Sequence, residues 1–316
     1  MASPTPAPSS PTLQEELALA IRHEHTALNQ LLSNRLPLCL PPHTSDPFIY
    51  AQGLCVVRHL YTGFEYAWET LLSQPPSDDS SIPTPSYLHT LRTPNLSRHL
   101  RQSRDVHDLS QQLGPHRTIQ LEKLIGATIH FHKSTFTLNL QHPHLILAYA
   151  WTLYLAIFNG GRFIRAELEK AGPGFWGGSP DKRDWPLEFF NFAGKEDGND
   201  VEREFKRRFD IAGEELSRQE KDDVVAEAKR IFGVFEAVVR ELDRRVVDGE
   251  GFGGVVLGGR MALRRVLQSP SVVVGGVLGW VCRGWWMVVG PCLGRRRKIS
   301  GGRGALGHEV QGEEKA

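Results

Sequence analysis

The sequence predicts an all-α protein, and three observations lead to that fold class. Apolar residues recur at steps of three and four over long stretches, which is the period of a helix with one buried face. Two pairs have capping-box spacing, Thr12 with Glu15 and Ser217 with Glu220, and both precede such stretches. Strand signals are scarce, since no turn residues separate alternating runs. We therefore expect a multi-helical bundle of roughly seven helices.

The first two helices are the clearest. The first begins at Thr12 and carries a stripe of residues on one face: Leu17, Ile21, His25, Leu28 and Leu32. The second runs roughly from Pro47 to Leu72 and has a broad buried side: Leu54, Val57, Leu60, Tyr61, Phe64 and Trp68. Residues 74–96 are rich in Pro, Ser and Asp and predict a long loop.

The later helices follow in order along the chain. Amphipathic segments are expected near 97–113 and 117–135, and the segment 144–170 is apolar almost all round. Residues 172–186 contain four glycines and three prolines and predict a connection. Helical signals return near 199–212. The long helix after Ser217 has an inward face: Val224, Ala228, Ile231, Phe232, Phe235, Val239 and Leu242.

Composition changes at both ends of this helical part. Residues 1–11 are rich in Pro and Ser, predict disorder and lack the pattern of a secretory signal. Residues 12–247 form the predicted helical domain, and 248–270 are a Gly-rich linker. Residues 271–294 are a hydrophobic span, and 295–316 are a polar, partly basic tail. About 20 residues suffice to cross a bilayer, so the span predicts a membrane tail anchor, with a surface-lying extension as the alternative.

Charge and cysteine usage exclude several classes. The 316 residues carry a formal net charge of +1, so no broad attraction to nucleic acid is expected. The four cysteines are spread out as Cys39, Cys55, Cys282 and Cys292. No pair has zinc-finger or redox-motif spacing, and no disulfide framework is indicated, which fits a reducing compartment.

Two features of the predicted helices could carry chemistry. His25 lies on the apolar stripe of the first helix, where a neutral imidazole can ligate a metal or simply bond a neighbouring polar group. Gly160 and Gly161 interrupt an apolar helix, where they permit a kink, tight helix packing, or a flat ligand against bare backbone. The basic residues Arg22 and Lys206 could neutralise ligand carboxylates or lie on a solvated face.

Taken in order, these segments resemble the haem oxygenase family over about residues 12–245. Ile21-Arg22-His23-Glu24-His25-Thr26 is similar to the first-helix motif, and His59-Leu60-Tyr61 with Glu65 to the second helix. The run from Ala150 to Gly161, Ala-Trp-Thr-Leu-Tyr-Leu-Ala-Ile-Phe-Asn-Gly-Gly, resembles the distal-helix signature. Three later stretches complete the pattern: Pro186–Phe192, Glu204-Phe205-Lys206 and Ala226–Phe232.

The resemblance implies a haem held between two helices and an activity. His25 takes the position of the iron ligand, and the backbone of Gly160 and Gly161, with Asn159, takes the catalytic distal position. Further haem-binding positions match Arg22, Tyr61, Trp151, Lys206 and Phe232. Haem would be substrate and cofactor, cleaved to biliverdin, carbon monoxide and ferrous iron with dioxygen and electrons from an NADPH-dependent reductase or another donor. The expected location is the endoplasmic reticulum membrane, with the domain facing the cytosol.

The distal signature departs from the family at several positions. The aspartate expected three residues before the Gly-Gly pair is Ile157, which can neither donate nor accept a hydrogen bond. The neighbouring glycine is Ala156, and the earlier tyrosine and arginine are Trp151 and Leu153. A late basic position is Asp210. A haem-binding protein of the same fold, for storage, sensing or weak peroxidase activity, is therefore the alternative.

A third class is a helical relative that takes another ligand. A di-iron oxidase needs inward carboxylates with Glu-x-x-His spacing, and we find no such spacing. A thiamin-related hydrolase needs a cysteine in the pocket, for which Cys55 is the candidate.

Overall fold

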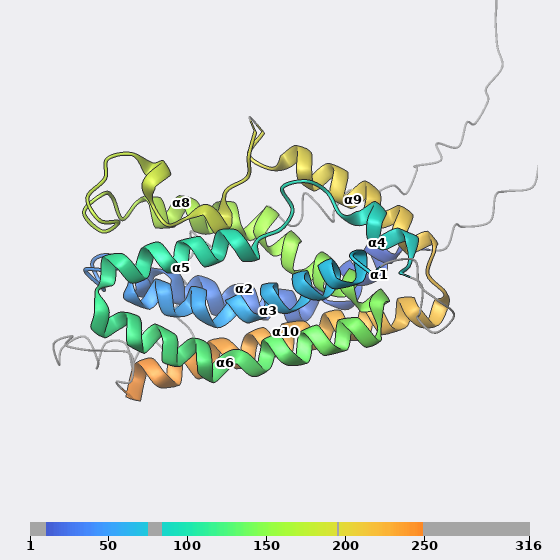
Figure 1. Ribbon diagram of the computed structural model, residues 1–316, viewed down its shortest axis with the longest axis horizontal. Helices are drawn as coiled ribbons and strands as arrows, with labels where there is room; N and C mark the ends of the chain where they lie inside the picture. Colours follow the sequence, from blue (N-terminus) through green and yellow to red (C-terminus); the bar gives the residue numbers. More distant parts are fainter. Residues whose placement is uncertain (1–10, 75–83, 195, 249–316) are drawn as a thin grey trace, which may run out of the picture.

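The computed structural model describes residues 11–74, 84–194 and 196–248, and this part of the chain is a bundle of helices without a strand (Figure 1). The α-helices are α1 (Leu13–Ala20), α2 (Arg22–Arg35), α3 (Phe48–Leu72), α4 (Ser86–Leu91), α5 (His99–Leu113), α6 (Pro115–Gln141), α7 (Ile146–Tyr149), α8 (Arg162–Glu169), α9 (Asn199–Glu214) and α10 (Arg218–Asp248). Short 3₁₀ turns are η1 (Leu36–Cys39), η2 (Pro143–Leu145), η5 (Lys182–Asp184) and η6 (Glu188–Phe190). The all-α prediction is confirmed for these residues.

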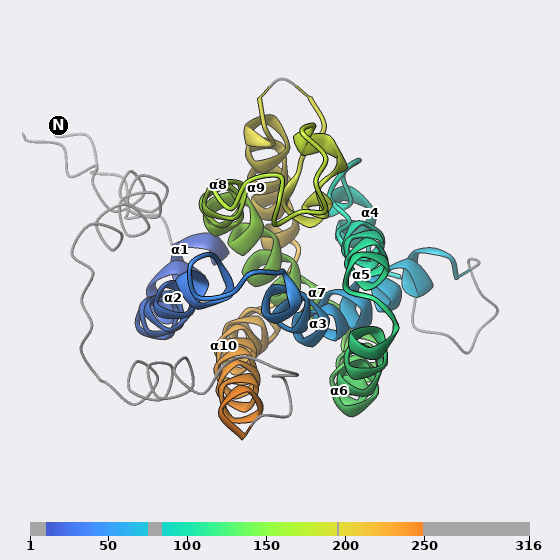
Figure 2. The same cartoon turned by 90° about the vertical axis from the view of Figure 1, so that its left-hand side faces the viewer.

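Helix α3 forms the centre of the bundle. Seen end-on, it lies between α1 and α2 on one side and α5 and α6 on the other, with α10 below and α8 and α9 above (Figure 2). Phe64 and Trp68 of α3 are fully buried. A Cβ on Gly63 would lie 2.9 Å from the backbone oxygen of His132 in α6. The glycine therefore lets these two long helices approach closely.

Local signals position several helix ends as expected. Thr12 and Glu15 form the predicted capping box at the start of α1. At the start of α10, the Glu220 carboxylate accepts from the Ser217 backbone N–H at 2.8 Å, and the Ser217 hydroxyl accepts from the Glu220 N–H at 3.3 Å. Each box satisfies backbone donors that the first helical turn leaves free.

The structure corrects three expectations about the helices. The first helix is divided at Ile21 into α1 and α2. The loop expected at 74–96 contains α4, whose Tyr87, Leu88 and Leu91 are buried. The helix expected within 144–170 is not a regular α-helix, because two π-helical segments, η3 (Ala150–Tyr154) and η4 (Ala156–Gly161), lie between α7 and α8.

The predicted N-terminal disorder, linker, hydrophobic span and polar tail concern residues 1–11 and 248–316, nearly all of which lie outside the described residues. Among the helices that are described, none has the length and apolar character to cross a membrane.

Candidate functional site

A cavity of about 500 Å³ lies between α2, α3, the π-helical segments, η6 and α10. This volume is within the range of small-molecule sites, and its walls are mainly apolar and aromatic. Except for Arg22 and Lys206, all the residues predicted from the sequence line it: His25, Tyr61, Trp151, Asn159, Gly160, Gly161 and Phe232. The bundle therefore brings together residues that are more than 200 positions apart in the chain.

One wall of the cavity is α2, which presents His25. The Phe232 ring of α10 meets the imidazole edge-on, with ring centroids 6.1 Å apart. Burial lowers the pKa of His25 to about 4, so the ring is neutral at physiological pH. A neutral imidazole is the form that ligates a metal ion.

Asn29 lies one turn after His25 on α2 and lines the same cavity. Its side-chain amide nitrogen lies 2.9 Å from Nε2 of His25 and 3.3 Å from Nδ1. The amide N–H can donate to the unprotonated ring nitrogen, so Asn29 competes with a metal ion for that nitrogen. The i, i+4 spacing of the two residues was the available signal for this contact.

The facing wall is the π-helical segment from Ala150 to Gly161, which we call the distal segment. Short π-helical stretches are rare and are often found at functional sites. The Tyr61 hydroxyl of α3 donates to the backbone oxygen of Leu153 at 3.0 Å. The Asn159 amide donates to the backbone oxygen of Leu155 at 3.1 Å. These bonds hold the widened backbone in place beside the cavity.

The two glycines at the end of the distal segment differ in their surroundings. A Cβ added to Gly160 would meet no heavy atom within 4 Å, so this residue presents bare backbone to open space. A Cβ on Gly161 would lie 3.1 Å from Phe190 Cδ1 and 3.3 Å from Ile157 Cγ2. Gly160 therefore leaves room for a ligand, whereas Gly161 is required for packing.

Two polar atoms of the distal segment are buried without a hydrogen-bond partner, Trp151 Nε1 and Thr152 Oγ1. Both residues line the cavity. The other described tryptophans have acceptors: Trp68 with Leu88, Trp176 with Leu168 and Trp185 with Ser179. A buried donor without an acceptor costs about 1–3 kcal/mol. The cavity therefore has hydrogen-bonding capacity that a ligand or a water can use.

No carboxylate is among the residues found to line this cavity. Ile157 lies on the distal wall and is buried, so the wall has an apolar side chain at this position. The cation among the lining residues is Arg162, the first residue of α8. Arg162 was missing from the predicted binding set, although its place directly after the two glycines was a usable signal.

The two predicted basic residues lie elsewhere. Arg22 is exposed at the start of α2 and does not line the cavity. Lys206 lies on α9 and lines a second cavity of about 430 Å³. Asn159 and Arg162 line both cavities, so the second one adjoins the first.

The described residues do not support the two other classes considered, a thiamin-related hydrolase and a di-iron oxidase. Cys55, the candidate nucleophile of a thiamin-related hydrolase, is fully buried on α3 and does not line the cavity. Burial raises the pKa of its thiol to about 12, so it stays protonated. Within the described ranges, no group of three or more His, Cys, Asp or Glu side chains is arranged to hold a metal ion, as a di-iron centre requires.

Comparison with solved structures shows which fold this is. The structure is similar to haem oxygenase 2 of Chlamydomonas reinhardtii without haem, with a TM-score of 0.59 and 23% identity over 73% of this chain and 98% of that one. It is also similar to haem oxygenase-2 of Synechocystis sp. PCC 6803 in complex with haem and NO, with a TM-score of 0.57 and 15% identity over 81% and 93% of the two chains. Haem oxygenase-1 of the same cyanobacterium, in complex with haem, gives 0.55 and 16% over 76% and 96%.

The chain therefore has the haem oxygenase fold, as its sequence motifs predict. No protein-family profile matches it, and no curated protein sequence matches it. At these identities the likeness concerns the fold alone.

Proposed function

We propose that this protein is a haem oxygenase, which cleaves haem to biliverdin, carbon monoxide and ferrous iron with dioxygen and electrons from a reductase. One observation carries the proposal: a single cavity has the neutral, half-buried imidazole of His25 on one wall and the open backbone of Gly160 on the other. A neutral nitrogen ligand across from open backbone suits a flat metal macrocycle, because the ligand can hold the metal while the glycine leaves room for the ring.

The residues of the cavity fit haem on three counts. His25 offers a neutral nitrogen ligand for the iron. Gly160 leaves space where any other residue would place a side chain. Trp151 Nε1 and Thr152 Oγ1 are buried without partners in the same cavity. A bound haem supplies the oxygen and electron-transfer chemistry, and the protein supplies its binding, orientation and surroundings.

Different side chains around the cavity would then bind the ligand, surround it and supply a polar group. His25 holds the ligand from α2, with Phe232 against the edge of its ring. Phe189 and Phe190 of η6 give the cavity an apolar aromatic lining, against which a flat ligand can pack. Thr152 Oγ1 can hold a water at the distal wall, where a proton is needed and no lining carboxylate is present.

A second function is favoured by Ile157. Without an acidic group on the distal wall, the same cavity suits a protein that binds haem for storage, sensing or weak peroxidase activity and cleaves it little or not at all. Ile157→Asp restores a carboxylate at this place, with Ile157→Leu as the apolar control. A higher yield of biliverdin from the aspartate variant alone indicates that the missing group limits cleavage.

The decisive experiment is a hemin titration of the full chain, followed by reduction in air while the visible spectrum is recorded. A Soret band that decays into biliverdin absorption supports the haem oxygenase. A stable Soret band, or bleaching without biliverdin, supports the second function. If the Soret band of added hemin stays that of free hemin, the protein binds no haem and both proposed functions are rejected.

We propose further that residues 271–294 anchor the protein in the endoplasmic reticulum membrane, with the helical domain in the cytosol. The support is the length and apolar character of this span in the sequence. Deletion of residues 271–316 should then release the protein into the soluble fraction. A truncated protein that still sediments with membranes rejects the anchor.

A further inference from the structure

A buried carboxylate on α3 joins the distal segment to the start of α5. Glu65 is fully buried, and its Oε1 accepts from the Tyr154 hydroxyl at 2.9 Å and from the Arg98 backbone N–H at 2.8 Å. Its Oε2 accepts from the Ser97 hydroxyl and from both the backbone N–H and Nδ1 of His99. Neither Glu65 nor Tyr154 is among the residues that line the cavity, so this cluster lies outside the site described above.

These donors keep Glu65 ionised. Burial opposes its ionisation, but the hydrogen bonds from His99, Ser97 and Arg98 more than offset this effect, so the pKa of Glu65 is lowered. Burial and the nearby charge of Glu65 raise the pKa of Tyr154, so the phenol keeps its proton. The contact is therefore a hydrogen bond from a neutral phenol to a carboxylate, which is stronger than a bond between two neutral groups.

The phenol lies at the junction of the two π-helical stretches. The first stretch, η3, ends at Tyr154, and the backbone N–H of Leu155 then makes an α-type bond before η4 begins. The Tyr61 hydroxyl bonds to the backbone oxygen of Leu153, and Glu65 accepts from Tyr154. Helix α3 therefore holds two adjacent residues of the distal segment at this junction.

The direction of the Tyr154 side chain depends on the π-helical register. A π-type bond spans one residue more than an α-type bond, and successive residues of an α-helix are about 100° apart around its axis. If η3 changed to the α-type pattern, Tyr154 would rotate by roughly one residue position and its hydroxyl would turn away from Glu65. The same shift would bring Asn159 to the direction that Gly160 now has, so an amide side chain would replace bare backbone.

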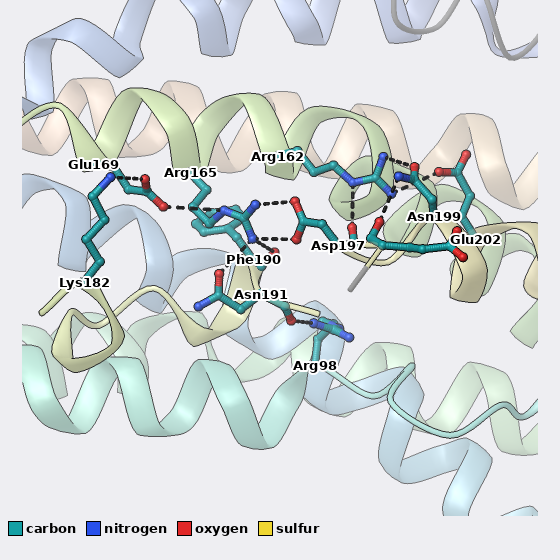
Figure 3. A network of polar contacts seen from close by, with 11 residues as sticks. Arg98, Arg162, Arg165, Glu169, Lys182, Phe190, Asn191, Asp197, Asn199 and Glu202 are labelled. Carbon is teal, nitrogen blue, oxygen red and sulfur yellow. Dashed lines mark hydrogen bonds and ion pairs between the residues drawn. The ribbon is translucent and has the colours of Figure 1, made fainter. Parts of the chain in front are cut away.

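The end of the distal segment packs against a wall that is held separately. A Cβ on Gly161 would lie 3.1 Å from Cδ1 of Phe190 in η6. The next residue, Asn191, is held from two helices: its Oδ1 accepts from Arg165 of α8 at 2.9 Å, and its backbone oxygen accepts from Arg98 at the start of α5 at 2.7 Å (Figure 3). Because this wall is fixed, the glycine that packs against Phe190 reports the register of the segment.

We propose that Glu65 and Tyr154 are positioning residues whose hydrogen bond holds the π-helical register of the distal segment and so keeps Gly160, rather than Asn159, towards the cavity. The inference deepens the proposed function, in which the space at Gly160 receives haem, and it rests on that function for the identity of the ligand. In the shifted register the Asn159 side chain would fill this space.

Two buried phenols provide a matched pair of variants. Tyr154→Phe removes the hydroxyl that bonds to Glu65 and keeps the ring, which packs edge-on against Phe64. Tyr149→Phe makes the same change on α7, where the hydroxyl donates to Glu227 at 2.7 Å. Tyr149 precedes the distal segment and does not line the cavity. Both variants lose one bond to a carboxylate, but only Tyr154→Phe should release the register.

The first measurement uses the full chain without ligand. Gly160→Ala and Gly161→Ala are compared by thermal unfolding in the parent, in Tyr154→Phe and in Tyr149→Phe. In the parent, Gly161→Ala should lower the unfolding temperature more than Gly160→Ala, because its methyl group meets Phe190. In Tyr154→Phe the order should reverse, because Gly160 then packs against Phe190. In Tyr149→Phe the order of the parent should persist.

The second measurement is a hemin titration of the same proteins. Tyr154→Phe should weaken hemin binding about tenfold, the effect expected for losing a hydrogen bond to a charged group, and Tyr149→Phe should bind hemin as the parent does. If Tyr154→Phe does not fold, Tyr61→Phe replaces it in the glycine comparison, because it removes the adjacent bond to Leu153.

Two results would overturn the inference. One is a Tyr154→Phe variant in which Gly161→Ala remains the more damaging substitution, because the phenol is then only structural. The other is a variant with the reversed order and unchanged hemin affinity, because the register then has no bearing on the ligand. If the parent binds no hemin, the proposed function is rejected, and the glycine comparison alone decides whether the bond holds the register.

Discussion

The two walls of the cavity are built on different principles. Helix α2 is a regular α-helix, and its contribution is one side chain, His25. The distal segment consists of two π-helical stretches, and its contribution is largely backbone. Gly160 leaves open space beside the cavity, and the backbone oxygen of Leu153 accepts from the Tyr61 hydroxyl. A substitution of His25 on the first wall therefore removes one proposed bond to the ligand. A substitution on the second wall instead changes the conformation or the free space of the π-helical backbone.

The largest effect on hemin affinity should come from the wall formed by α2, where His25 is the proposed ligand. His25→Ala removes the proposed iron ligand, and we expect hemin affinity to fall by more than the roughly 10–100-fold typical of losing a residue that only supports a metal ligand. The check is the Soret band during hemin titration. His23→Ala, two residues away and exposed, is the control and should bind as the parent does. An unchanged spectrum for His25→Ala would refute the ligand assignment.

A pH dependence should come from the residue that holds η6, another element that lines the cavity. Asp105 of α5 is fully buried and accepts from the backbone N–H groups of Glu188 at 2.9 Å and Phe189 at 2.7 Å, which holds η6 against the cavity. Burial raises the pKa of Asp105 from 3.8 to about 7. Because the folded pKa is the higher one, this group's contribution to stability is complete below pH 3.8 and is lost as the pH rises towards 7.

The measurement is the free energy of unfolding at several pH values for the parent and Asp105→Asn. Across that window the parent should lose about 1.4 kcal/mol per pH unit relative to the variant, which keeps an acceptor but cannot ionise. Parallel curves for the two proteins would show that Asp105 does not titrate in this range.

The paired glycines should separate packing from ligand space. Gly161→Ala forces a methyl group against Phe190 and Ile157, and we expect a loss of roughly 1–3 kcal/mol of stability. Gly160→Ala meets no neighbour and should gain up to about 1 kcal/mol of helix stability, while its methyl group narrows the cavity and weakens hemin binding. Thermal unfolding and hemin titration of both variants measure the two effects. Equal effects on stability would contradict the assigned roles.

The smallest effect should come from Trp151. Trp151→Phe removes the buried N–H that has no acceptor, so the ligand-free protein should be as stable as the parent or more stable. If a ligand accepts from this N–H, hemin affinity falls about threefold to tenfold. Trp176→Phe is the opposite case, since its indole donates to the backbone oxygen of Leu168 at 3.1 Å and its loss should lower stability. An affinity unchanged by Trp151→Phe would assign the N–H to solvent.

The comparison of α2 with the distal segment also explains which features could be predicted from the sequence. Helical period places α3 within one residue of its predicted start and identifies His25 as a residue of an inward-facing stripe, because both depend on local patterns. The π-helical backbone of the distal segment and the division at Ile21 escape such patterns, because hydrophobic periodicity does not distinguish an α-turn from a π-turn. Helix α4 is hidden by neighbouring prolines and serines, and its packing against α9 overrides their propensities.

Contacts between distant parts of the chain account for what was missed in the site. The contact between Arg162 of α8 and Glu202 of α9 joins two residues that are 40 positions apart in the chain. The missing acceptor of Trp151 is likewise a property of the folded interior, since an indole in the sequence gives no sign of its partner. A site residue on one helical face can be predicted, whereas the pairing state of a buried group requires the structure.

The close approach at Gly63 has a consequence for how a ligand enters. A Cβ at Gly63 would lie 2.9 Å from the backbone of α6, so the glycine lets α3 and α6 pack closely, and no other two described elements pack against each other as extensively. We therefore expect these two helices to act as a fixed frame during ligand exchange. An opening of the cavity would then fall to the other elements that line it, α2, the distal segment, α8, η6 and α10, and amide hydrogen exchange should be slowest in α3 and α6.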